Sequence, residues 1–195
     1  MTVERHGEIT RQTKETEVTA AVNIYGSGTA ELATGVAFLD HLLDQLSRHS
    51  GMDITVRAVG DLHIDAHHTV EDVALTLGQA FDQALGDRSG ISRFGDATVP
   101  MDEALASVAI DVSGRPYAAL DISFASEKLG ELPTQMIAHF LWSLALQAKF
   151  GLHARLLAGV NDHHRAEALF KALAVAMRRA FEPRAGGVPS TKGSL

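Results

Sequence analysis

The chain has 195 residues, 46% of them hydrophobic, which suits one large domain or two small fused ones with a proper core. The formal net charge of −7 and the lack of a strongly basic run argue against nucleic-acid binding. The absence of cysteine excludes disulfides, thiolate zinc sites and cysteine nucleophiles. No stretch approaches ~20 consecutive apolar residues, and the N-terminus lacks the apolar core of a signal peptide. We therefore expect a soluble, cytoplasmic protein without a membrane partner.

The first half of the chain predicts alternating strands and helices. Apolar residues alternate with polar ones across residues 8–25, which we read as extended structure ending in a GSGT turn. Leucines recur at helical spacing over residues 38–46, and Gly51 ends this helix. We expect further strands near residues 29–34 and over residues 52–59, and a second helix from His67 to about Gly86.

The second half repeats this order. We expect strands over residues 90–100, 105–112, 116–124 and 152–160, and helices over residues 133–150 and 163–181. The final stretch, RAGGVPSTKGSL, has no apolar periodicity. The pattern predicts an α+β fold with two tandem repeats, residues 1–90 and 91–185, each a small sheet carrying two helices, and a C-terminal tail over residues 186–195.

The most informative motif is HHxxE, which occurs twice, from His67 to Glu71 and from His163 to Glu167. Each copy enters an amphipathic helix, where the first histidine and the glutamate are one turn apart and share a face. An imidazole and a carboxylate so placed form half of a metal site. The second histidine of each pair points elsewhere, so each motif should serve two ions. A single HH pair is usually a surface accident, but its repetition at equivalent places favours metal binding.

The duplication adds two more histidines. DHLLDQLSRHSG and AHFLWSLALQAKFG each place a histidine at the start of a Leu-rich helix, which aligns His41 with His139. The resulting eight candidate ligands are His41, His67, His68, Glu71, His139, His163, His164 and Glu167. Imidazole and carboxylate ligands without sulfur suit zinc, iron or manganese. An octahedral ion with four such ligands would keep two open positions, as catalysis requires.

The repeat symmetry suggests how these ligands divide between two ions. One set would combine His67 and Glu71 with His164, and the other would combine His163 and Glu167 with His68. His41 and His139 would complete one set each. The spacing leaves open which histidine joins which set, and whether one chain or several copies complete each site.

Several segments resemble one known family. FLDHLLDQLSRHSGMD, DAHHTVEDVALTLGQAF and GVNDHHRAEALFKALAVAM closely resemble the imidazoleglycerol-phosphate dehydratases of histidine biosynthesis. RQTKETEV, GISRFG, SGRP and PSTKG match the same family in the same order, so the resemblance covers nearly the whole chain. The resemblance includes no phosphatase domain, so we expect the monofunctional form.

The resemblance implies a tandem duplication of a ribosomal-protein-S5-domain-2-like unit. It implies a lyase that dehydrates D-erythro-imidazole glycerol phosphate to imidazole acetol phosphate, with two Mn²⁺ per active site. It also implies a homo-oligomer, a 24-mer built from trimers, with active sites between subunits. It groups the metal ligands into two sets: His67, Glu71, His139 and His164 on one ion, and His41, His68, His163 and Glu167 on the other.

The resemblance also implies roles for residues outside the metal sets. Glu15, which we expect on a strand, is the first candidate for proton transfer; Glu71 and Glu167 are weaker candidates because metal ions would occupy them. The implied substrate contacts are Glu15, Gln45, His49, Arg93, Arg115, Lys171, Ser190 and Lys192. Of these, Arg93, Arg115, Ser190 and Lys192 would converge on the phosphate, with Ser190 and Lys192 in the tail. Taken singly, each basic residue is more often a solvated surface charge.

The expected reaction removes a poorly acidic hydrogen from carbon and expels a hydroxyl group. Metal ions on the substrate's ring nitrogens would stabilise imidazolate, whose electron density can expel the neighbouring hydroxyl. Two alternatives remain. A dinuclear phosphoester hydrolase would more usually have Asp-rich ligands, and a non-catalytic shell protein assembled by metal would need closed metal sites and no role for Glu15.

Overall fold

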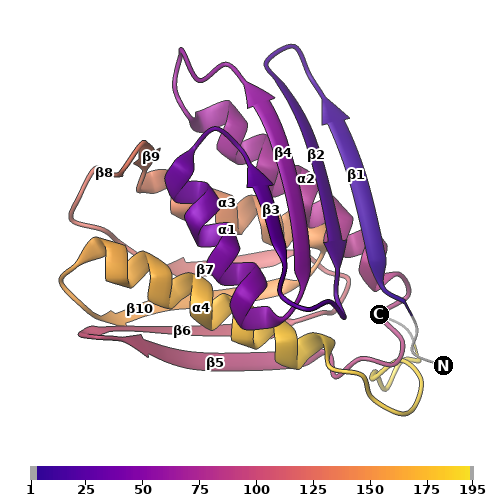
Figure 1. Ribbon diagram of the computed structural model, residues 1–195. Coiled ribbons are helices and arrows are strands. Elements are labelled where there is room, and N and C mark those ends of the chain that lie inside the picture. The colour runs from indigo at the N-terminus through magenta and orange to yellow at the C-terminus, as the bar shows by residue number, and fades with distance from the viewer. Residues whose placement is uncertain (1–3, 194–195) are drawn as a thin grey trace.

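Two four-stranded sheets with helices between them form the protein (Figure 1). This computed structural model describes residues 4–193, so the last two residues of the expected tail lie outside the described range. In the first repeat the elements are β1 (His6–Gln12), β2 (Thr16–Asn23), β3 (Ala30–Ala33), α1 (Ala37–Ser50), β4 (Asp53–Gly60) and α2 (His67–Leu85). In the second they are β5 (Phe94–Met101), β6 (Ala104–Asp111), β7 (Tyr117–Asp121), α3 (Gln135–Ala148), β10 (Gly151–Ala158) and α4 (Asp162–Phe181).

The two sheets have the same topology. Their strand orders are β1-β2-β4-β3 and β5-β6-β10-β7, with two antiparallel pairings followed by one parallel pairing in each. The parallel strands are joined through α1 in the first repeat and through α3 in the second. This arrangement confirms the predicted α+β fold of two similar sheets, each with helices. The short pair β8 (Lys128–Leu129) and β9 (Leu132–Pro133) was not predicted.

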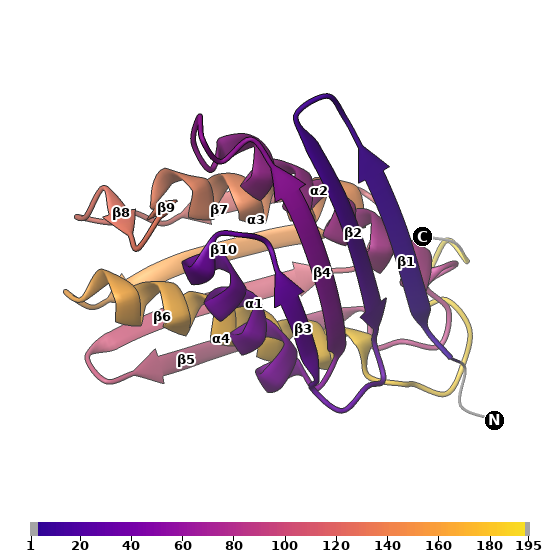
Figure 2. The ribbon, with the colours of Figure 1, turned by 45° about the horizontal axis from the view of Figure 1, so that its top comes forward.

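The helices pack across the two repeats (Figure 2). α2 lies on β1 and β2 of its own sheet and also packs against α3 of the other repeat. In the same way, α4 lies on β5 and β6 and packs against α1. The inner strand faces carry the expected alternation: Val18, Ala20 and Val22 are buried in β2. Each HHxxE helix therefore has a helix of the other repeat as its neighbour.

One strand expectation is wrong in detail. Residues 8–25 form a hairpin rather than one extended segment, because the chain turns between Gln12 and Thr16. The turn is closed by the backbone N–H of Thr13, which donates to the carbonyl of Thr16 at 2.9 Å. The turn contains no glycine or proline, the residues that most strongly mark a turn in sequence. Glu15 consequently lies in this turn and not on a strand.

Two glycines show how closely the sheets and the HHxxE helices approach each other. A Cβ added to Gly7 of β1 would lie 2.1 Å from the carbonyl oxygen of Ala80 in α2. A Cβ added to Gly95 of β5 would lie 2.0 Å from the carbonyl oxygen of Ala176 in α4. Both distances are far inside van der Waals contact, so only glycine fits at either place. The two repeats therefore use the same close contact to seat the helix on the sheet. Among the described residues, no helix is long and apolar enough to cross a bilayer.

We predict that Gly95→Ala lowers the free energy of unfolding by about 1–3 kcal/mol, the usual cost of overpacking a close-packed contact. Gly151→Ala in β10 is the matched control, because its added Cβ would find its nearest neighbour at 3.8 Å. Urea unfolding of the metal-free protein measures both. Equal stability of the two variants would contradict the close contact.

Candidate metal centre

An Asx side chain two residues before the first histidine accepts a backbone hydrogen bond at the start of each HHxxE motif. The carboxylate of Asp65 accepts a hydrogen bond from the backbone N–H of His67 at 2.7 Å. The amide oxygen of Asn161 accepts from the backbone N–H of His163 at 3.0 Å. Because such side chains satisfy free N–H groups at a helix N-terminus, they fix where the helix begins. Both histidine pairs consequently lie in the first turn of their helices.

The first cluster joins the motif of α2 to α3. Nε2 of His139 lies 3.2 Å from Oε1 of Glu71, and Nε2 of His67 lies 3.8 Å from Oε2 of the same carboxylate. One ligand atom from each of the three residues lies within 4.8 Å of the others. His139 Nε2 is buried and has no hydrogen-bond partner among the described residues. A buried imidazole nitrogen aimed at a carboxylate without hydrogen-bonding it fits a metal ligand.

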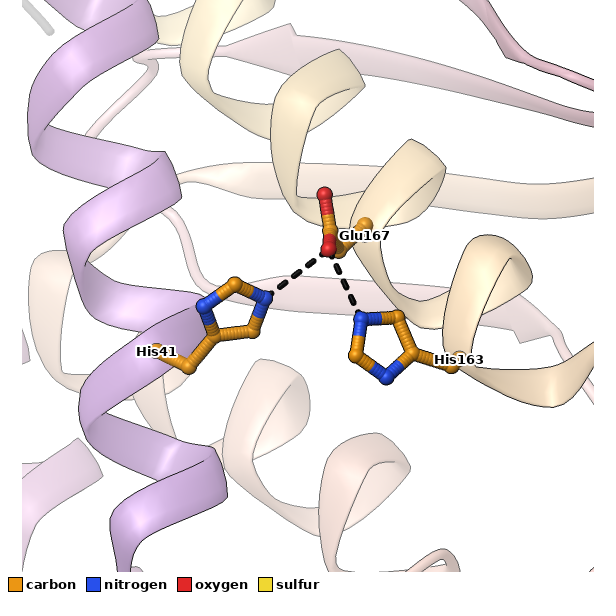
Figure 3. Close-up of side chains that lie close together, drawn as sticks. All are labelled: His41, His163 and Glu167. Atoms are coloured by element: carbon orange, nitrogen blue, oxygen red, sulfur yellow. Dashed lines mark hydrogen bonds and ion pairs between the residues drawn. The ribbon is translucent and has the colours of Figure 1, made fainter.

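The second cluster joins the motif of α4 to α1 (Figure 3). Oε1 of Glu167 lies 2.8 Å from Nε2 of His41 and 2.8 Å from Nε2 of His163. The three ligand atoms again lie within 4.8 Å of one another. Glu167 is buried, whereas the side chains of His41 and His163 are 38% and 47% exposed, so the cluster opens to solvent on its histidine side. Both clusters therefore offer three nitrogen and oxygen ligands and an open face, which fits a catalytic divalent ion.

The remaining two candidate ligands lie apart from the clusters. Nδ1 of His68 is hydrogen-bonded to Asp61 at 2.9 Å, and Nδ1 of His164 is hydrogen-bonded to Glu103 at 2.8 Å. The bond to Asp61 raises the pKa of His68, and the bond to Glu103 raises the pKa of His164. In turn, the hydrogen bond from His164 lowers the pKa of Glu103 to about 2. Within one chain, each cluster thus gathers three of the four ligands that the family resemblance groups together.

Three predicted substrate contacts lie on the two packed helices α1 and α4. Gln45 and His49 follow His41 at one-turn intervals, and Oε1 of Gln45 lies 3.2 Å from Nε2 of His49. Lys171 lies one turn after Glu167 and pairs with its Oε2 at 2.7 Å. Burial, and then the charge of Lys171, lower the pKa of His49. Lys171 was expected to face substrate; here its ammonium group is held by the Glu167 carboxylate.

Arg93 anchors the C-terminal tail. Its guanidinium forms a two-point ion pair with Asp111 at 2.7 and 3.2 Å and donates to the carbonyl of Pro189 at 2.8 Å. Its backbone has φ +73°, an uncommon value for a non-glycine residue. The backbone N–H of Arg93 donates to the carbonyl of Ala180 at the end of α4, which holds the residue in place.

A cavity of about 550 Å³ lies where the tail meets the second sheet. It gathers the four residues expected to converge on a phosphate, together with one that was not predicted: Arg93, Arg115, Ser190, Lys192 and Arg184. Asp111 neutralises Arg93 from behind, but no carboxylate lines the cavity itself, and Arg115, Arg184 and Lys192 make it positively charged. Guanidinium and ammonium groups of this kind suit a phosphate.

The cavity and the second cluster lie at opposite ends of α4. The cluster uses the first turns of this 20-residue helix, and Arg184 follows the helix end. A helix of this length spans about 30 Å, at 1.5 Å per residue. No small ligand can contact both within one chain.

Sequence reasoning missed three residues of this region. Arg184 lies in an EPRAGG segment without a recognisable pattern, and it reaches the cavity because the chain after α4 pairs with Gly90 and Ile91, just before β5. Asp61 and Glu103 also carried no motif. Glu103 could have been found by aligning the two repeats, because the spacing from Gly7 to Gly95 is the same as that from Glu15 to Glu103.

Comparison with known proteins identifies relatives along the whole chain. A family model described as imidazoleglycerol-phosphate dehydratase matches residues 34–177. The imidazoleglycerol-phosphate dehydratase of Dehalococcoides mccartyi is 55% identical over 194 residues, covering 98% of this chain and 97% of that protein. The one from Methanothermobacter thermautotrophicus is 54% identical over 186 residues, 95% of each.

Solved structures agree with these sequence matches. The crystal structure of imidazoleglycerol-phosphate dehydratase from Staphylococcus aureus has a TM-score of 0.83 at 31% identity, covering 91% of this chain and 99% of that one. The structure from Pyrococcus furiosus has a TM-score of 0.83 at 35% identity, covering 96% and 100%. Together with these relatives, the duplicated α+β fold and its site define a dehydratase, a lyase acting on a phosphorylated imidazole. The chain belongs to the imidazoleglycerol-phosphate dehydratase family of histidine biosynthesis, as its motifs predict.

The carboxylate of the second cluster predicts an acid limit to stability. Burial raises the pKa of Glu167, but hydrogen bonds from Lys171, His41 and His163 outweigh this and lower it from 4.5 to about 2. A carboxyl group whose pKa is lower in the folded state than in the unfolded state stabilises the fold at pH values above the unfolded-state pKa. This stabilisation is lost as the pH falls through the folded-state pKa. In the metal-free protein, Glu167→Gln should therefore flatten the fall in unfolding free energy between pH 4.5 and pH 2. Urea unfolding at several pH values measures this, and an unchanged slope would contradict it.

Proposed function

We propose that this chain dehydrates imidazole glycerol phosphate to imidazole acetol phosphate at two-metal sites shared between copies of the chain. The supporting observation is the separation along α4: the second cluster, which suits metal, and the cavity that suits phosphate are too far apart for one substrate. The substrate carries its imidazole and its phosphate on one short carbon chain. A site that holds both ends must therefore take its metal ligands and its phosphate contacts from different copies.

The donor atoms support two ions per active site. Each cluster would hold one ion, and His164 or His68 from another copy would supply the fourth ligand. Six imidazoles and two carboxylates, without sulfur, are compatible with manganese. Ions bound there would supply Lewis-acid stabilisation of negative charge on the substrate's imidazole ring. The open faces of the clusters favour this role over that of a closed structural site.

The chain's own residues would hold the substrate and move protons. In the cavity, Arg115, Arg184, Ser190 and Lys192 would bind the phosphate, while Arg93 positions the tail through Pro189. The tail, residues 186–195, is thus a substrate-contacting segment that follows two repeats over residues 1–90 and 91–185. This remote binding would fix the orientation of the reacting carbons. Because a phosphorylated substrate does not cross membranes freely, the reaction would take place in the cytoplasm.

Glu15 is the proposed proton-transfer group. It lies in the β1–β2 turn, its side chain is 55% exposed, and its Oε2 is 3.8 Å from Nδ1 of His68. An exposed carboxylate beside a proposed metal ligand can reach a substrate held on that ion. Glu71 and Glu167 are weaker candidates for this step, because both would be occupied as metal ligands.

The activity is tested by incubating the manganese-loaded protein with imidazole glycerol phosphate. A dehydratase yields an enolisable ketone and releases no inorganic phosphate. A dinuclear phosphoester hydrolase would release phosphate instead, and a metal-assembled shell protein would do neither. Phosphate release, or an unchanged substrate, would contradict the proposal.

Glu15→Gln should keep both metal ions and the assembly but lose turnover. The change is nearly isosteric and removes only the capacity to transfer a proton, which typically contributes ~10²–10⁴-fold. Steady-state kinetics measure the loss, and metal content measured on the same sample is the control. A variant that retains activity within about threefold of the parent would reduce Glu15 to a substrate contact.

A further inference from the structure

The second histidine of each HHxxE motif is held by a carboxylate that no motif identifies. Asp61, just after β4, is hydrogen-bonded to Nδ1 of His68. Glu103, in the β5–β6 turn, is hydrogen-bonded to Nδ1 of His164. Both bonds use the same ring nitrogen, so both leave Nε2 as the nitrogen that can receive an ion. A carboxylate behind a metal-ligating histidine fixes the ring orientation and tautomer and makes the ligand more basic.

The two carboxylates come from positions that are not equivalent in the two repeats: Asp61 follows a strand, and Glu103 lies in a hairpin turn. Glu103 occupies the hairpin position in the second repeat that Glu15 occupies in the first. The carboxylate of Glu103 is hydrogen-bonded to Nδ1 of His164 at 2.8 Å. The carboxylate of Glu15 is 3.8 Å from Nδ1 of His68, which is hydrogen-bonded to Asp61 instead.

The second repeat has no carboxylate at the position of Asp61. A bulge in β10 makes Gly159 the counterpart of Gly60: an added Cβ would meet Thr69 and Thr16 at Gly60, and the equivalent Arg165 and Ala104 at Gly159. The counterpart of Asp61 is therefore Val160, an exposed apolar residue. Glu103 is therefore the carboxylate that reaches the histidine there. In the first repeat, Asp61 is hydrogen-bonded to the histidine, and the hairpin glutamate, Glu15, is not.

We propose that Asp61 and Glu103 are positioning residues, which hold His68 and His164 with the proton on Nδ1 so that Nε2 is presented to an ion of another copy. This rests on the proposed two-metal function. The two hairpin glutamates then have different roles: Glu103 positions a metal ligand in the second repeat, whereas its counterpart Glu15 can transfer a proton in the first.

Glu103→Gln separates this role from a merely structural one. Oε1 of Glu103 also accepts hydrogen bonds from the backbone N–H groups of Val160 and Asn161, at 3.2 and 2.8 Å. The glutamine oxygen can keep these two bonds, which turns its NH₂ group toward His164. An NH₂ group donates to Nδ1 instead of accepting from it, and the imidazole proton should move to Nε2. The variant thus keeps the loop and inverts the tautomer.

Asp102→Asn is the matched control. Asp102 lies in the same turn, its removal changes the charge equally, and its nearest approach to His164 is 3.9 Å, to Nε2 and not to Nδ1. Its backbone has φ +46°, which asparagine tolerates well. Asp61→Ala repeats the test at His68, where it removes the acceptor.

The first measurement is the imidazole ¹⁵N spectrum of metal-free protein, at a pH high enough to keep the rings neutral, with the His164 signals assigned from a His164→Gln sample. We expect a protonated Nδ1 in the parent chain and in Asp102→Asn, and a protonated Nε2 in Glu103→Gln. The same tautomer in all three would overturn the proposal. Because this measurement involves no metal, it stands even if the proposed function fails.

The second measurement is a manganese titration by calorimetry. The loss of such a supporting carboxylate typically weakens metal affinity 10–100-fold. We expect a loss of that order for one of the two ions in Glu103→Gln and in Asp61→Ala, and less than about threefold in Asp102→Asn. Equal losses in Glu103→Gln and Asp102→Asn would show a charge effect only and overturn the proposal. Parent protein that binds no manganese would instead refute the proposed function.

Discussion

Each candidate metal cluster depends on the packing of a helix of one repeat against a helix of the other. α2 meets α3, and α4 meets α1, so that His139 reaches the His67–Glu71 pair and His41 reaches the His163–Glu167 pair. Without this exchange, each HHxxE helix would present only two ligands. The close contacts at Gly7 and Gly95 seat the two motif helices on their sheets in the same way, and so hold both clusters in equivalent positions.

The duplicated framework carries two sites that are alike in ligands but not in surroundings. Glu167 is buried and paired with Lys171, whereas Glu71, with a side chain 36% exposed, has Leu75 at the position that corresponds to Lys171. The carboxylates behind His68 and His164 differ too. The two halves of the duplicated scaffold therefore place equivalent candidate ligands in different electrostatic surroundings.

Local patterns in the sequence predicted most of the helices and strands and singled out the candidate metal ligands. The leucine spacing of α1 and the two HHxxE copies report directly on helices and on their exposed faces. The β1–β2 turn was missed, because Thr13, Lys14 and Glu15 carry no turn signal. The association of His139 with His67, and the approach of Arg184 to the cavity, depend on contacts between distant segments. No local pattern encodes such contacts, and the carboxylates Asp61 and Glu103 belong to the same class.

The central claim is that one chain carries two incomplete metal sites, which another copy completes. The most direct test is the mass of the protein in solution, measured by light scattering alongside its metal content, before and after chelation and after manganese is returned. We expect small oligomers without metal and, with about two manganese ions per chain, a large assembly. An unchanged mass after complete removal of the metal, or two ions bound tightly to an isolated chain, would contradict it.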